Sequence, residues 1–193
     1  PVQLSYFPKR THARMRKALA HFGSCDNIMA APRQELLACG WDSDTVDTFL
    51  AWRRECNTEA IAAYLADQHI QTITIEDDAY PPQLQHLHDP PLCLFIRGNF
   101  SRYTTSIAVV GSRKMTSYGK LVIDTLIPEL VQAGVTIVSG LAYGIDSTAH
   151  KATLAAGGIT HAVLGSGVDT GSIAPRNHVR LAEDILAVSY THL

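Results

Sequence analysis

The chain has 193 residues, of which 46% are hydrophobic and 18% charged, and its formal net charge is −2 with histidine neutral. This composition is typical of a globular protein that buries a core, as one large domain or two small ones. It excludes a surface that is basic all over, so any contact with nucleic acid requires positive charge concentrated in one groove.

The four cysteines, Cys25, Cys39, Cys56 and Cys93, lie far apart and form no CxxC pair. This spacing predicts reduced thiols in a cytosolic protein, with neither a disulfide framework nor a metal site. No apolar run approaches the ~20 residues that a membrane span needs, and no signal peptide is visible. We therefore expect a cytoplasmic protein that makes no contact with membranes.

The N-terminal segment, residues 1–68, has the apolar periodicity of short helices. The first apolar stripe ends at Phe22, and Gly23 is suited to end that helix. Asp42 or Ser43 is placed to cap the N-terminus of a later helix. The segment is therefore predicted to be a small all-helical domain.

The following segment, residues 69–105, is predicted to be a linker that contains short strands. Residues 72–75 alternate like a strand, and residues 92–96 form a second short apolar run. Two Pro-Pro pairs, Pro81-Pro82 and Pro90-Pro91, interrupt regular structure between them.

From residue 106 onward, strands and helices alternate. Apolar runs at residues 107–110, 135–138 and 161–164 are separated by a helical stretch at residues 118–133 and by a second helix that begins at Asp146 or Ser147. Strands that are apolar on both faces predict a parallel sheet covered on both sides. With right-handed crossovers, residues 106–193 are predicted to form part of a doubly wound, Rossmann-like α/β sheet.

Each of the three apolar runs ends in small or polar residues. The carboxyl ends of parallel strands share one edge, where glycine lets backbone amides approach a ligand and helix N-termini favour an anion. We therefore predict a phosphate site, against the alternative that the glycines only form tight turns. The predicted set is Gly111, Ser112, Arg113, Ser139, Gly140, Ala142, Gly144, Gly165 and Gly167.

The loops lack the patterns of common nucleotide sites and of catalysis. The chain contains no GxxxxGK[ST] sequence, and neither glycine loop completes GxGxxG. Arg113 is predicted to grip a phosphate, with a surface salt bridge as its alternative. Asp146 and His150, four residues apart, are interpreted as a helix cap and a packing residue. No nucleophile–base pair is evident, so we predict no catalytic residue.

Several motifs resemble the DNA-processing protein A family, also called Smf. They are VGSR at residues 110–113, SYG at 117–119, IVSGLAYGID at 137–146, with Ala149-His150, and AVLGSGVD at 162–169, with Pro175 and Asn177 after them. Tyr80-Pro81, Leu84, Asp89-Pro90-Pro91 and Arg97-Gly98 continue the resemblance upstream. It covers about Phe22 to Leu186.

The resemblance implies a bacterial protein that binds single-stranded DNA during natural transformation and hands it to the RecA recombinase. It implies no enzymatic activity and no cofactor, and a homodimer as a possible assembly. The N-terminal helices are similar to the family's sterile-alpha-motif-like or helix-hairpin-helix-like domain. Arg176 stands where relatives often place a basic residue, and it joins the predicted DNA-binding set.

The chain departs from the family pattern in two places. The loop after Asp169 is two residues longer and lacks a tyrosine, and residues 187–193 do not continue the pattern. We interpret the end as a truncation with an artefactual tail. Two other functions are left open: a phosphoribohydrolase of the lysine-decarboxylase-like type, whose PGGxGTxxE motif does not occur in this chain, and a fragment that makes protein–protein contacts through its helices.

Overall fold

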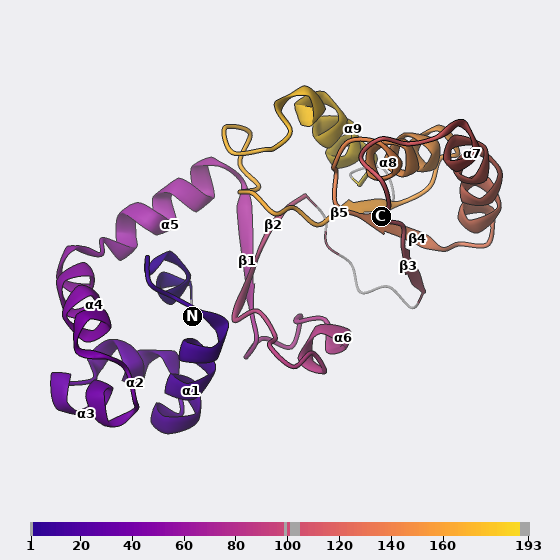
Figure 1. Ribbon diagram of the computed structural model, residues 1–193. Coiled ribbons are helices and arrows are strands. Elements are labelled where there is room, and N and C mark those ends of the chain that lie inside the picture. Colours follow the sequence, from indigo (N-terminus) through magenta and orange to yellow (C-terminus); the bar gives the residue numbers. More distant parts are fainter. Residues whose placement is uncertain (1, 99, 101–104, 190–193) are drawn as a thin grey trace. The chain divides into compact units, whose positions relative to one another are not determined.

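The computed structural model describes residues 2–98, 100 and 105–189. The chain divides into two compact units, Pro1–Phe95 and Ile96–Leu193 (Figure 1). The division falls within the segment 69–105, which the sequence assigns to a linker. Each unit is described by itself below.

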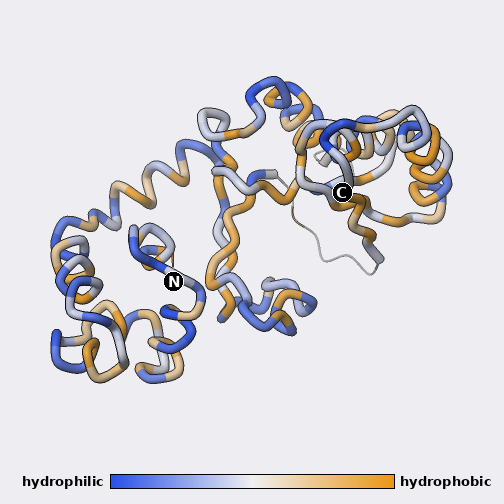
Figure 2. The backbone as a smooth tube through the Cα atoms, viewed as in Figure 1, coloured by the Kyte–Doolittle hydropathy of each residue, from blue (hydrophilic) through white to orange (hydrophobic). Residues whose placement is uncertain are grey.

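The first unit begins with short helices, as its apolar periodicity predicts. In chain order they are η1 (Gln3–Tyr6), α1 (His12–Phe22), α2 (Cys25–Ala30), α3 (Arg33–Ala38), α4 (Ser43–Glu55) and α5 (Thr58–Asp67). Figure 2 shows hydrophobic and hydrophilic residues alternating around these helices. This pattern lets each short helix bury one stripe, since helices of this length are marginal in water on their own.

Local signals set the ends of these helices. Gly23 adopts a φ of +76° and its N–H donates to the Leu19 carbonyl at 2.8 Å, so the predicted stop is confirmed. Of the two candidate caps for α4, Asp42 is the one used, and its carboxylate accepts from the Thr45 N–H at 2.8 Å.

Aromatic rings form the centre of the first unit's core. Phe7 and Phe49 are fully buried, and Trp41 is nearly so. The Phe7 ring stacks on Trp41 at 6.0 Å between centroids and meets Phe49 edge-on at 5.3 Å. Such arrangements add to the free energy gained from buried area alone.

The short strands β1 (Ile70–Thr74) and β2 (Cys93–Arg97) pair in a two-stranded sheet, with the single turn α6 (Pro82–Gln85) between them in sequence. Both strands lie within one or two residues of the predicted runs. Tyr80 is 1% exposed, and its hydroxyl donates to the Pro91 carbonyl at 2.7 Å. This bond ties the two proline-containing stretches together.

The second unit is a mixed α/β fold with a parallel sheet, which confirms the predicted fold class. Its elements are β3 (Ser106–Ala108), α7 (Ser117–Gln132), β4 (Thr136–Ser139), α8 (Ile145–Ala155), β5 (Thr160–Ala162), η2 (Arg176–His178) and α9 (Val179–Ser189). The strand order is β3-β4-β5, and Ile137 of β4 pairs with Ile107 on one side and Thr160 on the other.

Three predicted boundaries shift. β3 and β5 end earlier than their apolar runs, at Ala108 and Ala162. α8 begins at Ile145, before both Asp146 and Ser147, because Gly144 takes the N-cap position with a φ of +79°. Backbone hydrogen bonds between the strands continue for one more residue, since the Val109 and Val163 N–H groups donate to the Val138 and Ser139 carbonyls at 2.9 and 2.8 Å.

The expectation that helices cover both faces is met on one face of the described sheet. Ile137 and Ala149 are fully buried between β4 and the helices α7 and α8. On the opposite face Val110 is 72% exposed and Val163 67% exposed. With the strand order β3-β4-β5, two successive right-handed crossovers place α7 and α8 on the same side, which explains the difference.

Candidate nucleic-acid interface

The loops after β3 and β4 meet at the carboxyl edge of the sheet. The Ile145 N–H donates to the Ser112 carbonyl at 3.2 Å. A methyl group at Gly144 would lie 2.2 Å from that same oxygen and 2.8 Å from the carbonyl carbon of Arg113. The structure therefore brings Ser112, Arg113 and Gly144 together, as the shared-edge argument predicts.

The segment after β5 reaches the same edge through η2. The buried His178 side chain contacts the Leu141 carbonyl through Nδ1 at 2.8 Å. Its ring also lies 4.9 Å from the ring of Tyr143. Arg176, two residues before His178, is therefore held near the loop after β4.

Some of the predicted phosphate ligands are already hydrogen-bonded within the protein. The Ser139 hydroxyl donates to the Val109 carbonyl at 2.6 Å. The Gly140 N–H donates to the Asp146 carboxylate at 3.2 Å. Asp146 therefore holds the preceding loop, and its interpretation as the cap of α8 is wrong.

Four of the predicted glycines lie close to other atoms of the protein. Added methyl groups would lie 2.7 Å from Ile145 at Gly111, 2.8 Å from Asp146 at Gly140 and 2.7 Å from Ser172 at Gly167, in addition to the contact at Gly144. At Gly165 no atom lies within 4 Å of such a methyl group. Ala142 is half-buried between Leu141 and Tyr143.

The two predicted arginines are exposed but differ in their partners. Arg113 forms no ion pair with any residue in the described part of the chain. Lys114 beside it is also exposed, and the sequence reasoning missed it although it directly follows Arg113. Arg176 uses Nη1 to donate to the carbonyls of Thr170 and Gly171 at 2.9 and 2.8 Å. It thereby orders the longer loop after Asp169.

The charges are divided unevenly between the units. Ile96–Leu193 contains eight Lys and Arg against six Asp and Glu, a net charge of +2. Pro1–Phe95 contains eight against twelve, a net charge of −4. The overall charge of −2 is therefore the sum of a negative first unit and a positive second unit, and the positive unit is the one that contains the predicted phosphate site.

His150 lies inside the unit, and its predicted packing role is confirmed by full burial. The Thr160 hydroxyl donates to the Ile137 carbonyl at 2.8 Å, so its oxygen accepts a hydrogen bond from the Nδ1–H of His150 at 2.7 Å. Nε2 then carries only a lone pair, and it has no hydrogen-bond partner among the described residues. Burial lowers the pKa of His150 to about 4, which keeps the ring neutral at physiological pH.

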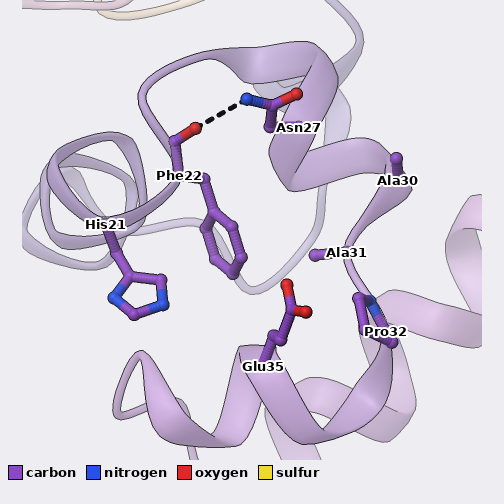
Figure 3. A pocket seen from close by; sticks show the side chains of 7 residues that line it. All are labelled: His21, Phe22, Asn27, Ala30, Ala31, Pro32 and Glu35. Atoms are coloured by element: carbon purple, nitrogen blue, oxygen red, sulfur yellow. Dashed lines mark hydrogen bonds between the residues drawn. The ribbon is translucent and has the colours of Figure 1, made fainter.

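One hollow in the first unit is less suited to phosphate. Its lining residues lie on α1, on α2 and at the start of α3, and Figure 3 shows the Glu35 carboxylate within it. A carboxylate repels anions, and none of the predicted site residues lies there.

Among the described residues, no group of three or more His, Cys, Asp or Glu side chains is placed to hold a metal. No described helix combines the length and apolar character needed to cross a membrane.

The motif-bearing part of the chain matches the family model of DNA recombination-mediator protein A over residues 71–191. The chain belongs to the DNA recombination-mediator protein A family. The match extends five residues beyond Leu186, where the sequence predicts the resemblance to end. The prediction that residues 187–193 depart from the family pattern is therefore wrong as far as residue 191. Residues 187–189 continue α9, and the rest of the proposed tail lies outside the described residues.

Proteins from Escherichia coli and Bacillus subtilis are similar to the chain. Protein Smf of Escherichia coli is 40% identical over 139 residues, which cover 72% of this chain and 36% of that protein. DNA processing protein DprA of Bacillus subtilis is 40% identical over 125 residues, covering 64% and 41%. The chain therefore spans about two fifths of the length of these family members.

Two solved structures of DNA processing protein A are also similar. The protein from Streptococcus pneumoniae superposes with a TM-score of 0.74 at 29% identity, covering 95% of this chain and 62% of that one. The protein from Helicobacter pylori, whose structure concerns its single-stranded DNA binding mode, gives a TM-score of 0.50 at 30% identity. That alignment covers 62% of this chain and 53% of the other.

Proposed function

We propose that the chain binds single-stranded DNA without sequence preference, through the carboxyl edge of the sheet in the second unit. The observation that carries the proposal is Arg113, an exposed guanidinium without an ion-pair partner among the described residues, at the point where two loops meet. A planar guanidinium binds phosphate oxygens in pairs. Lys114 and Arg176 add positive charge at the same edge. Backbone amides play a smaller part than the sequence predicts, because Gly140 already donates to Asp146.

The family relationship supports the wider role. DNA processing protein A of Helicobacter pylori binds single-stranded DNA, and the relatives from Bacillus subtilis and Streptococcus pneumoniae are named DNA processing proteins. We extend this to a role for the chain in DNA processing during natural transformation, by binding and without catalysis. Transfer of the strand to RecA, assembly as a homodimer and a cytoplasmic location stay predictions.

Salt is expected to weaken this binding. If three cations each neutralise one phosphate, the slope of log K against log salt for a single strand is about −2, or roughly a 20-fold loss between 50 and 200 mM. An oligothymidylate titrated at several salt concentrations, beside a duplex of equal length, measures both slope and preference. An affinity that does not depend on salt concentration, or a duplex that binds as tightly as the single strand, contradicts a phosphate-binding edge for single strands.

Arg113→Ala is expected to lower the affinity for single-stranded DNA by about 1.5–3 kcal/mol, the range for a hydrogen bond to a charged group. The side chain is exposed, so the melting temperature should change little. Arg113→Lys should recover only part of the loss, because an ammonium cannot form the paired bonds.

Arg54→Ala is the matched control for Arg113, because Arg54 is also exposed but lies in the helical unit. Its affinity should equal that of the wild type. An Arg113→Ala protein that binds normally, or one whose loss follows from unfolding alone, removes Arg113 from the interface.

A further inference from the structure

The loop between β4 and α8 carries an aromatic side chain that is exposed to solvent. Tyr143 is 45% exposed, although the next residue, Gly144, lies against the backbone of Ser112 and Arg113. Two residues of this loop have positive φ, Leu141 at +60° and Gly144 at +79°. Leu141 is fully buried and anchors the loop, since a leucine in this conformation is tolerated only where packing imposes it.

The exposed ring is also held in place from one side. His178 meets the Tyr143 ring at an interplanar angle of 62°, with 4.9 Å between the ring centroids. His178 is itself buried and contacts the Leu141 carbonyl at 2.8 Å. Tyr143 is thus restrained before any ligand arrives, which lowers the entropy cost of binding against it.

Two segments that carry arginines contact the loop of Tyr143. Gly144, the next residue, touches the backbone of Ser112 and Arg113. Arg176 lies two residues before His178, whose ring contacts Tyr143. Tyr143 is therefore close in the fold to the segments of both arginines.

We propose that Tyr143 is a stacking platform for one base of the bound strand, between the phosphate contacts of Arg113 and Arg176. This rests on the proposed function and adds a contact to bases, because the arginines bind only the backbone. Stacking tolerates any base, since every base has a π face, and it excludes a paired base in a regular duplex. Tyr143 therefore supplies a preference for single strands that phosphate contacts alone do not give.

The test compares two strands of equal charge. One is an oligothymidylate of about 20 nucleotides, and the other has the same backbone with abasic residues in place of the bases. The wild type is expected to bind the abasic strand roughly 5- to 150-fold more weakly, the range for loss of one stacked base. Tyr143→Leu should lose affinity for oligothymidylate by a similar factor and change little toward the abasic strand. Tyr143→Phe, which keeps the ring, should behave like the wild type.

Controls separate this inference from the proposed function. Arg113→Ala should weaken binding of both strands by the same factor. Tyr64→Leu, at a tyrosine that is 48% exposed in the helical unit, should weaken neither.

Equal binding of both strands by the wild type overturns the stacking platform and leaves the phosphate edge standing. Binding of neither strand overturns both. A folded Tyr143→Leu protein that keeps the wild-type preference for oligothymidylate also overturns the stacking platform. Tyr143→Gln takes its place if the melting temperature shows that Tyr143→Leu does not fold.

Discussion

Gly144→Ala is expected to lower the free energy of unfolding of the second unit by about 2–6 kcal/mol. Two costs combine at this position. The backbone has a φ of +79° and a ψ of −121°, and a residue with a side chain in this conformation is strained by about 1–3 kcal/mol. The new methyl group would also lie 2.2 Å from the Ser112 carbonyl oxygen. Such overpacking typically costs about 1–3 kcal/mol more.

The clash also changes the candidate site. The methyl group has backbone as its neighbour, so the loop that carries Arg113 must move away from the start of α8. We expect loss of the Ile145–Ser112 hydrogen bond and weaker binding of single-stranded DNA. Urea unfolding followed by circular dichroism measures the stability, and hydrogen exchange across α8 locates the loss.

Gly157→Ala isolates the conformational part of this cost. Gly157 has a similar φ of +73°, but no atom lies within 4 Å of the position of a new methyl group. Gly157→Ala should lower the free energy of unfolding by about 1 kcal/mol, which is the cost of an alanine in the left-handed conformation without a clash. If the two variants were equally stable, close packing between the two loops would be disproved.

The second large effect is loss of stability in mild acid, through His150. Its pKa is lowered by burial to about 4, from 6.5 in the unfolded chain. Between these values the unfolded chain binds more protons than the folded one, so stability falls with falling pH. The contribution of neutral His150 is complete above pH 6.5 and is lost as the pH approaches 4. Between pH 7.5 and 5 this amounts to about 2 kcal/mol.

The hydrogen bonds of His150 explain why its protonation is unfavourable in the folded protein. Nδ1 of His150 already donates to Thr160, so the added proton goes to Nε2, which has no acceptor among the described residues. Burial also lowers the pKa of His161 to about 4, which adds to the fall in the same direction.

Urea unfolding at several pH values tests the role of His150. His150→Asn should be less stable than the wild type at pH 7.5, yet lose about 2 kcal/mol less on acidification to pH 5. His86→Ala, at an exposed histidine, should keep the wild-type pH dependence. A His150→Asn protein with the full wild-type slope contradicts the assignment of this effect to His150.

The sequence alone determined the order of secondary structure and the family. Apolar periodicity is local, so it identified the helices before residue 68 and the alternating strands and helices after residue 106. Capping chemistry is also local: Gly23, which lacks a Cβ, takes the left-handed position at the end of α1, and the Asp42 carboxylate caps α4. The phosphate edge followed from one rule, that parallel strands share their carboxyl ends.

Only the tertiary structure decided which polar groups at that edge are free. Nothing in the spacing of Gly140 and Asp146 indicates that one amide is bonded to the other's carboxylate, since the bond depends on how the loop folds back over α8. The same holds for Arg113 and Arg176, two exposed arginines of which only Arg176 bonds to loop carbonyls. Tyr143 stands in a recognised motif, but its exposure results from two positive-φ residues and a buried His178 that lies 35 positions away. Hydrogen bonding and exposure depend on contacts distant in sequence, and local patterns do not encode these.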